Sequence, residues 1–284
     1  MSEKRADVTF QYCDEIIDQF EKVCKHPIKS KSSKYYVGVD LGTACVVVAV
    51  LDENFRPVAG AYQYADVVRD GMVVDYFGAV QIIRGMKEKL EQELGVEELL
   101  YAAAAIPPGT DTLDGGAVKN VVQGAGFELT NLLDESTAAN AVIRIKNGAI
   151  VDIGGGTTGI SIFKDGKVVY VADEPTGGTH FSLVLAGAMH VPFEDAELKK
   201  RDPKNHREIL PVLKPVVEKV AAIIKQHIQG YNVDEIYLVG GTCCLTGIED
   251  IIQKQTGIPT RKPKNPMFAT PLGIALNCKQ EEMY

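Results

Sequence analysis

This sequence of 284 residues has no long apolar run, no cysteines in C-x-x-C spacing and no excess of basic over acidic residues. The longest apolar run, residues 44–51, is far shorter than the roughly 20 residues that a membrane helix needs. The charged N-terminus also lacks the apolar core of a secretory signal. We therefore expect a cytoplasmic protein with no membrane partner.

The cysteine spacing and the charge balance exclude two further classes of site. None of the six cysteines forms a C-x-x-C pair, so a zinc site has no spacing to support it. Free buried thiols are expected, with a redox role of vicinal Cys243-Cys244 as the alternative. A net charge of −8 argues against a broad nucleic-acid footprint, because that needs clustered Lys and Arg. Packing or surface roles are expected for His180, His190, His206 and His227, which show no ligand spacing.

A glycine-rich stretch, VDIGGGTTGISIF at residues 151–163, contains the G-x-G-x-x-G register of a dinucleotide fingerprint. That fingerprint requires a helix after the glycines, because the helix N-terminus binds the pyrophosphate. Here residues 159–163 alternate as in a strand, residues 164–166 are typical of a hairpin turn, and residues 168–171 continue as a strand. The sequence therefore predicts strand, glycine turn and strand, and excludes a Rossmann site.

An internal repeat relates the two halves of the chain. At an offset of 112 residues, residues 40–42 (Asp-Leu-Gly) match residues 152–154 (Asp-Ile-Gly), and residues 52–54 match the turn at 164–166. Each copy reads as three strands joined by a glycine turn and a hairpin turn, so we expect two similar α/β domains. A carboxylate at the carboxyl end of a strand lies where ligands bind in α/β sheets. An Asp that only caps its own turn is the alternative for either copy.

Helical periodicity fills the intervals between these strands. The predicted helices cover residues 78–95, a segment with apolar positions between 118 and 125, residues 135–146, 215–229 and 246–255, and a last helix from Thr270. The helix at 246–255 begins with a capping box, Thr246 and Glu249, and stops at Gly257. An apolar stripe at residues 10–24 predicts an N-terminal helix. This helix either packs on its own domain or binds a partner, with residues 29–34 as a flexible hinge.

Five motifs in order along residues 36–276 resemble those of the actin and DnaK-type chaperone ATPase superfamily. They are a first phosphate motif at residues 40–43, a first connecting motif at 133–139, a second phosphate motif at 152–157, an adenosine motif at 238–242 and a second connecting motif at 269–275. The resemblance implies an α/β fold of two actin-like, ribonuclease H-like domains with mixed sheets flanked by helices. Within the superfamily, the chain resembles the small chaperonin-like proteins of ethanolamine utilization.

The resemblance also implies a domain layout. Residues 1–33 would form a helical extension, residues 34–148 domain I, and residues 149–284 domain II, with the C-terminal helix returning to domain I. The interval from Leu183 to Glu218 is short, so the subdomain that chaperones insert there would be small or missing. No peptide-binding domain is expected after Leu276, and a partner would then have to meet the ATPase module itself.

The resemblance implies that the ligand is ATP or ADP. Glycine turns let backbone N–H groups approach phosphate oxygens, and threonines add hydroxyl donors. The expected nucleotide-binding residues are Gly42, Thr43, Gly154, Gly155, Gly156, Thr157, Gly177, Gly178, Gly240 and Gly241. Glu197 and Lys200 join them because residues 196–200 resemble the Ala-Glu-x-x-Lys element that contacts ribose and adenine in bacterial actin-like proteins. Ordinary loop chemistry is the alternative for Gly177-Gly178.

Three carboxylates, Asp40, Glu135 and Asp152, would face the triphosphate. A carboxylate about 5 Å from a phosphate charge is repelled by roughly 3 kcal/mol at an effective dielectric near 20, so a divalent cation is needed. Mg²⁺ fits because it keeps several waters and binds one or two carboxylates plus phosphates. We expect Asp40 and Asp152 to hold Mg²⁺ mostly through water. By the resemblance, Glu135 would orient or deprotonate the attacking water.

Two functions follow from the resemblance and stay open. The first is a chaperone-like ATPase that assists assembly or reactivation of a protein partner, such as ethanolamine ammonia-lyase or a bacterial microcompartment shell component. The second is a non-hydrolysing, nucleotide-bound adaptor or scaffold. Hydrolysis is expected to be slow or absent, because the catalytic lysine of DnaK-type chaperones has only Arg69 as its nearest candidate here. A sugar or acid kinase is disfavoured, since neither a substrate-binding insertion nor a base near an acceptor is found.

Overall fold

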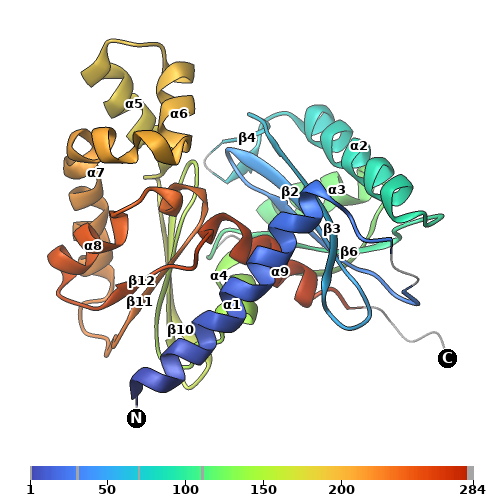
Figure 1. The fold of residues 1–284 in the computed structure, drawn as a ribbon, viewed down its shortest axis with the longest axis horizontal. Coiled ribbons are helices and arrows are strands. Elements are labelled where there is room, and N and C mark those ends of the chain that lie inside the picture. The colour runs from blue at the N-terminus through green and yellow to red at the C-terminus, as the bar shows by residue number, and fades with distance from the viewer. Residues whose placement is uncertain (1, 30–31, 70, 110–111, 280–284) are drawn as a thin grey trace. The chain divides into compact units, whose positions relative to one another are not determined.

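The computed structural model describes residues 2–29, 32–69, 71–109 and 112–279. The chain divides into two compact units. Unit 1 comprises Met1–Arg144 and Phe268–Tyr284, and unit 2 comprises Ile145–Met267. Each unit contains a five-stranded sheet among its described residues, and Figure 1 colours the elements by their position along the chain.

The sheet of unit 1 combines a three-strand meander with two parallel strands in the order β3-β2-β1-β6-β7. Its strands are β1 (Tyr36–Leu41), β2 (Cys45–Leu51), β3 (Pro57–Tyr64), β6 (Tyr101–Ile106) and β7 (Glu128–Asp134). β1, β6 and β7 run parallel, so their carboxyl ends lie at one edge of the sheet. The short strands β4 (Val68–Arg69) and β5 (Met72–Val73) form a separate hairpin.

The sheet of unit 2 repeats this plan in the order β10-β9-β8-β11-β12. Its strands are β8 (Gly148–Ile153), β9 (Thr158–Lys164), β10 (Lys167–Glu174), β11 (Ile236–Val239) and β12 (Thr260–Arg261). Asp40 pairs with Val47, and Asp152 pairs with Gly159 at the same offset of 112 residues. The predicted repeat is therefore confirmed, and an antiparallel strand follows the glycines where a Rossmann site would need a helix.

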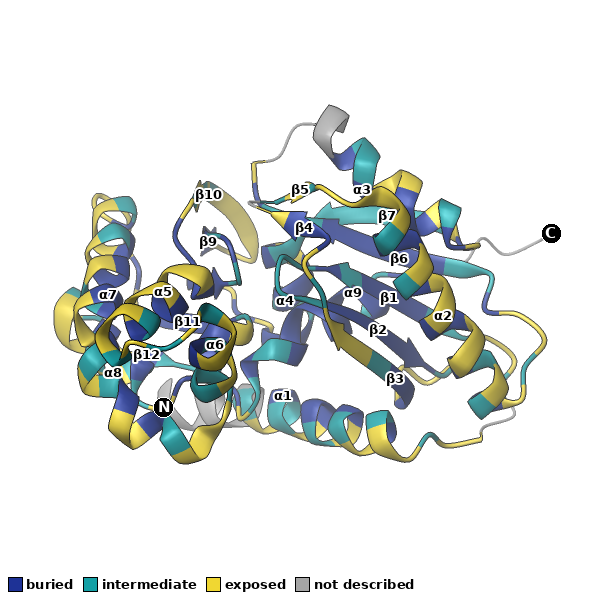
Figure 2. Cartoon of the chain, turned by 90° about the horizontal axis from the view of Figure 1, so that it is seen from above, coloured by how far each residue is buried: buried dark blue, intermediate teal, exposed yellow. Residues whose placement is uncertain are grey.

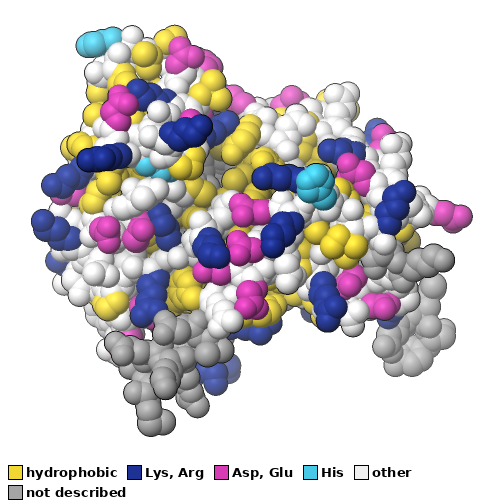
Figure 3. Space-filling model, viewed as in Figure 1, with side chains coloured by type: hydrophobic (Ala, Val, Ile, Leu, Met, Phe, Trp, Pro, Cys, Tyr) yellow, Lys and Arg dark blue, Asp and Glu magenta, His cyan; other side chains and the backbone are white. Residues whose placement is uncertain are grey.

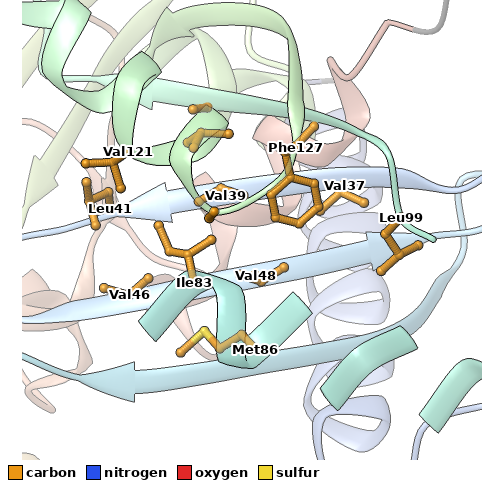
Figure 4. Packing of buried hydrophobic residues seen from close by; sticks show 14 of the residues in the cluster. Val37, Val39, Leu41, Val46, Val48, Ile83, Met86, Leu99, Val121 and Phe127 are labelled. Atoms are coloured by element: carbon orange, nitrogen blue, oxygen red, sulfur yellow. The ribbon is translucent and has the colours of Figure 1, made fainter. Parts of the chain in front are cut away.

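Helices pack against both faces of the unit 1 sheet. α2 (Tyr76–Leu94) and α3 (Thr112–Gly124) cover the face to which Val37 and Val39 point, as the side chains in Figure 4 show. α4 (Glu135–Ile143) and α9 (Ala269–Leu276) pack against each other, and they share a second cluster with Ala103 and Ala105. Because successive side chains of a strand point to opposite faces, α4 and α9 cover the other face.

The N-terminal helix α1 (Ser2–Lys25) packs along the edge strand β3. Its buried positions include Cys13, Ile16, Ile17, Phe20 and Val23, so the apolar stripe packs on its own unit, as the first alternative expected. The Phe20 ring meets Phe268 edge-on with 5.1 Å between centroids, and the Arg144 guanidinium lies 3.7 Å from the centre of the Tyr12 ring. Within the predicted hinge after α1, residues 30 and 31 lie outside the described residues.

In unit 2 the helices form one apolar core with their sheet. They are α5 (Gly178–Met189), α6 (Phe193–Arg201), α7 (His206–His227) and α8 (Ile248–Thr256). Three short 3-10 segments complete the described part of the chain: η1 (Pro203–Asn205), η2 (Gly241–Cys244) and η3 (Pro266–Phe268). The edge strand β10 is largely exposed, whereas its neighbour β9 is buried along most of its length, and Figure 2 shows β10 mostly in the colour of exposed residues.

The predicted start of the longest helix in unit 2 is wrong. α7 begins at His206 rather than Pro215, and it contains both Pro211 and Pro215. Each proline removes a backbone donor and usually ends a helix. Here Ile209 and Leu213 are fully buried, so the apolar stripe extends towards the N-terminus past both prolines and the packing outweighs the lost hydrogen bonds.

The predicted capping box is also wrong. α8 begins at Ile248, after Gly247 in the left-handed conformation with φ of +87°. The Thr246 N–H instead donates to Nδ1 of His206 at 3.0 Å, and the Glu249 carboxylate pairs with Lys262 at 2.7 Å. Tertiary partners thus occupy both groups that a local cap would use, whereas the predicted stop at Gly257 is confirmed.

The third predicted helix is shorter than expected. α4 ends at Ile143 rather than Lys146, because Arg144 turns left-handed with φ of +62° and closes the helix. None of the described helices has the length and apolar content to span a bilayer. On the face drawn in Figure 3, Lys and Arg side chains are interspersed with Asp and Glu.

Candidate nucleotide site

In unit 2 the glycine turn between β8 and β9 is held by its own backbone. The N–H of Gly154 donates to the carbonyl of Thr157 at 3.0 Å. Asp152, one residue from the end of β8, is only 8% exposed and lies close to Cys243. Burial, and then the charge of Asp152, raise the pKa of the Cys243 thiol well above its ordinary value. A protonated thiol is a poor nucleophile, so the redox alternative for Cys243-Cys244 gains no support.

The start of α5 is bonded directly to this turn. Gly177 is the N-cap of α5 and supplies no side chain. The N–H groups of Gly178 and Thr179 donate to the carbonyls of Gly154 and Gly155, at 2.9 and 2.8 Å. A Cβ on Gly177 would lie 2.7 Å from the carbonyl carbon of Gly156. The two glycines therefore bring two backbone segments into contact, which ordinary loop chemistry does not require.

The adenosine motif reaches the same turn from β11. β11 runs parallel to β8, with Val239 level with Asp152, and Gly240 follows with φ of +91°. A Cβ on Gly240 would overlap Oδ1 of Asp152, so only glycine fits at this position beside the carboxylate. Thr242, two residues on, donates its hydroxyl to the carbonyl of Gly154 at 2.7 Å.

The fourth segment comes from α6, where Lys200 and Glu197 form an ion pair at 2.7 Å. Lys200 also donates to the carbonyl of Gly178 at 2.7 Å. Glu197 accepts further hydrogen bonds from Ser182 and from Arg201. Burial raises the pKa of Glu197, but Lys200, Ser182 and Arg201 outweigh it and lower the pKa below its ordinary value. Burial lowers the pKa of Lys200 in spite of Glu197.

Four sequence segments predicted separately thus meet within unit 2: the turn at 154–157, Gly177-Gly178, the pair Glu197 and Lys200, and Gly240-Gly241 with Thr242. Sequence reasoning missed three supporting side chains, Ser182, Arg201 and His206. Arg201 follows Glu197 at i+4, a spacing that favours ion pairs on a helix. No local pattern marks the bond between Ser182 and Glu197, 15 residues away, or the bond between His206 and Thr246, 40 residues away.

The remaining predicted residues lie in unit 1. Asp40 is the penultimate residue of β1, and Gly42 and Thr43 form the turn to β2, with the Gly42 N–H donating to Cys45 at 3.2 Å. Glu135 is the first residue of α4, directly after β7. Because β1 and β7 end at the same edge with one strand between them, the backbones of Asp40 and Glu135 are two strand spacings apart, roughly 10 Å.

Among the described residues, no three His, Cys, Asp or Glu side chains gather into a ready-made metal cage. Asp40 in unit 1 and Asp152 in unit 2 each carry a carboxylate, which is the type of ligand that Mg²⁺ takes together with waters and substrate phosphates. Such residues would contribute charge and orientation, while the phosphates and water complete the coordination.

Comparison with known proteins extends these observations. A family model described as type IV pilus assembly protein PilM matches residues 126–269. The ethanolamine utilization protein EutJ of Salmonella typhimurium is 44% identical over 265 residues, covering 92% of this chain and 93% of that protein.

Solved structures of related proteins also resemble this chain. The crystal structure of EutJ from Carboxydothermus hydrogenoformans has a TM-score of 0.90 at 46% identity, covering 94% of this chain and 99% of that one. MreB5 of Spiroplasma citri bound to AMPPNP has a TM-score of 0.71 at 17% identity over 86% of this chain and 96% of that one, which shows a shared fold. The chain therefore belongs to the EutJ family of ethanolamine utilization proteins, and it has the actin-like fold.

Proposed function

We propose that the chain binds ATP and ADP with Mg²⁺ and acts as a chaperone-like ATPase of ethanolamine utilization. It would change state with the bound nucleotide and so assist assembly or reactivation of a protein partner. One observation carries the proposal: the four segments with nucleotide-binding patterns, which are spread over residues 154–242, are hydrogen-bonded together around Gly154 and Gly178 in unit 2.

Each segment has a role that follows from its chemistry. The glycine turns, at Gly42 in unit 1 and at 154–156 in unit 2, would present N–H groups to phosphate oxygens, with hydroxyls from Thr43 and Thr157. Gly177-Gly178 would admit phosphate, and Gly240-Gly241 would admit adenosine. Glu197 and Lys200 would contact ribose and adenine; for this, Lys200 would exchange one of its present hydrogen bonds for the ligand.

The acidic residues would interact with the triphosphate through a bound Mg²⁺ ion. Mg²⁺, when bound, offsets the repulsion between carboxylates and triphosphate and polarises the phosphate that is transferred. Asp40 of unit 1 and Asp152 of unit 2 would hold the ion through its waters. Glu135 would orient the attacking water and accept its proton.

Calorimetric titration of the wild type and of Asp152→Asn with Mg-ATP tests this function. We expect the substitution to weaken Mg-ATP binding at least tenfold, about 1.4 kcal/mol, and to weaken binding without Mg²⁺ much less. Asp165→Asn, the same change in the exposed hairpin turn between β9 and β10, is the matched control. Wild-type protein that binds no adenine nucleotide, or an Asp152→Asn variant that binds Mg-ATP as the wild type does, would refute the proposal.

A non-hydrolysing adaptor is the second candidate, and Arg69 favours it. Its side chain is 65% exposed and is paired at 3.3 Å with Asp66, whose side chain is 77% exposed, so Arg69 forms a surface ion pair rather than a cation directed at a phosphate. Single-turnover measurements with labelled ATP separate the two candidates. Phosphate release that disappears in Glu135→Gln but persists in Glu128→Gln, an exposed control on β7, supports an ATPase, whereas binding without release supports an adaptor.

The partner is proposed from the family alone. Ethanolamine ammonia-lyase and microcompartment shell proteins are the two candidates, and association with a microcompartment in the cytoplasm would follow. Mixing each purified candidate with the chain and comparing co-elution in Mg-ADP and Mg-ATP tests them. A nucleotide-dependent complex with one candidate supports the assignment, and no complex with either in any nucleotide state excludes both.

A further inference from the structure

His206 connects two parts of the nucleotide site that are distant in sequence. Only 3% of the residue is exposed. Its Nδ1 lies 3.0 Å from the backbone nitrogen of Thr246 and 3.0 Å from the Thr246 hydroxyl. Its Nε2 lies 2.9 Å from the carbonyl oxygen of Lys200. The imidazole therefore links Lys200, at the end of α6, to Thr246, at the end of the segment that starts at Gly240.

These contacts form part of a closed ring of hydrogen bonds. Lys200 donates to Gly178, the N–H of Gly178 donates to Gly154, and Thr242 donates to the same Gly154 carbonyl. The backbone continues from Thr242 to Thr246, and His206 closes the ring back to Lys200. Every segment assigned to the nucleotide in unit 2 is a member of this ring.

The ring fixes the protonation state of the imidazole. A backbone N–H can only donate, so Nδ1 of His206 must accept from Thr246 and carries no proton. A carbonyl can only accept, so Nε2 must carry the proton that it donates to Lys200. Two independent partners thus require the neutral tautomer with hydrogen on Nε2, because the protonated ring has two donors and no acceptor.

Protonation would break one side of this bridge. A proton on Nδ1 could be donated to the Thr246 hydroxyl, but the Thr246 N–H would then lose its acceptor and face a second donor 3.0 Å away. Two donors that face each other at this distance repel, because each directs a partially positive hydrogen at the other. The segment that carries Gly240, Gly241 and Thr242 would have to shift to relieve it.

We propose that His206 is a positioning residue of the nucleotide site, and that nucleotide affinity falls when His206 is protonated. The inference rests on the proposed function. Under this proposal, acid lowers nucleotide affinity by moving Lys200 and the adenosine segment, and His206 itself makes no contact with the ligand.

Several charged groups on the elements around His206 form ion pairs with one another. On α6, Glu197 pairs with Lys200 and Arg201, and Lys199 pairs with Glu208 of α7 at 2.9 Å. From the side of α8, the Glu249 carboxylate lies 2.7 Å from Lys262, although its Oε2 is buried without a well-oriented hydrogen bond. On the adjoining η1, the Asp202 carboxylate accepts a hydrogen bond from the backbone of Lys204. The imidazole itself makes its polar contacts with Thr246 and Lys200.

The test compares ADP binding by the wild type and by His206→Asn from about pH 8 down to the lowest pH at which both proteins remain folded. The Asn amide oxygen can replace Nδ1 as the acceptor for Thr246, but it does not titrate. We expect wild-type affinity to fall about tenfold more than that of His206→Asn across this range. Taking the ratio of the two proteins removes the titration of the ADP phosphate itself, which also occurs near pH 6.

Two further measurements keep the outcome decisive. Thr246→Val removes the hydroxyl that could accept a proton from Nδ1, so its acid sensitivity should exceed that of the wild type. Nitrogen NMR of the imidazole in the wild type, without nucleotide, should show the Nε2–H form at neutral pH. A proton on Nδ1 there, or equal pH profiles for wild type and His206→Asn, would overturn the inference. A wild type that binds no ADP at any pH would instead count against the proposed function.

Discussion

At the residue scale, Gly240 is a position where sequence identity is tightly constrained. Its φ of +91° and ψ of 157° are essentially restricted to glycine, and a Cβ there would overlap the Asp152 carboxylate. Backbone strain of this kind is unfavourable by about 1–3 kcal/mol for a residue with Cβ. Gly240→Ala should therefore lower the free energy of unfolding by more than about 2 kcal/mol. It should also reduce Mg-ATP affinity, because the added methyl group would displace the Asp152 carboxylate.

Denaturant unfolding and calorimetric titration check this prediction, and Gly241→Ala is the matched control. A Cβ at Gly241 would meet open space, so that variant should keep the stability of the wild type. Equal stability of Gly240→Ala and Gly241→Ala would show that the backbone beside Asp152 is more tolerant than the contacts indicate.

Glu197 gives stability a defined dependence on pH. Its folded pKa lies below the ordinary value of 4.5, so its contribution is fully present above about pH 5 and is lost as the pH falls through the folded pKa. Glu197→Gln would leave Lys200 and Arg201 without their partner and should destabilise the protein by about 3 kcal/mol at pH 7.

The difference between wild type and Glu197→Gln should shrink below pH 4.5, and urea unfolding at pH 7, 5 and 3.5 measures it. Glu194→Gln, in the exposed first turn of α6, is the control and should behave as the wild type at every pH. A difference that grows in acid would contradict the lowered pKa of Glu197.

At the scale of elements, α1 stabilises unit 1 and contacts both residues where that unit meets the rest of the chain. Phe20 is fully buried against Phe268, and Phe20→Ala should lower the unfolding free energy by about 3–5 kcal/mol. Tyr12 stacks on Arg144, a contact worth about 0.5–2 kcal/mol. Tyr12→Ala should mainly speed amide exchange at residues 144–147.

Hydrogen exchange with mass spectrometry measures this effect, and Tyr12→Phe is the control because it keeps the aromatic ring. The prediction fails if Tyr12→Ala and Tyr12→Phe exchange at equal rates around Arg144. It also fails if exchange rises uniformly over unit 1, since that would indicate general destabilisation.

The same scale shows what sequence could and could not predict. Hairpins were predictable because turn residues and alternation are local, as at Asp165-Gly166 between β9 and β10. The start of α7 could not be predicted, because the packing of Ile209 and Leu213 outweighs the helix-breaking effect of two prolines. The cap of α8 could not be predicted, because His206, 40 residues away, accepts the hydrogen bond of the Thr246 N–H. The glycine segments of the site were visible in sequence, but the side chains that join them were not.

At the scale of the whole molecule, the repeat gives each unit one acidic hairpin, with Asp40 in unit 1 and Asp152 in unit 2. If both act on one Mg-ATP, their substitutions should not be additive, since either removes part of the same interaction. Mg-ATP at 100 times its dissociation constant should add about 2.7 kcal/mol of stability to the wild type.

Scanning calorimetry of the wild type, Asp40→Asn, Asp152→Asn and the double variant tests this prediction. Each single variant should lose most of the thermal shift produced by Mg-ATP, and the double variant should lose little more. Asp165→Asn should keep the full shift. Strictly additive losses would mean that the two carboxylates serve independent sites.

The contacts of α1 with Arg144 and Phe268 have a practical consequence. The polypeptide passes from one unit to the other at these two residues, and a single helix touches both. A fluorophore placed on the outward side of α1 would therefore sense a rearrangement at either passage, which makes this helix a natural position for an optical reporter of the proposed nucleotide-dependent change.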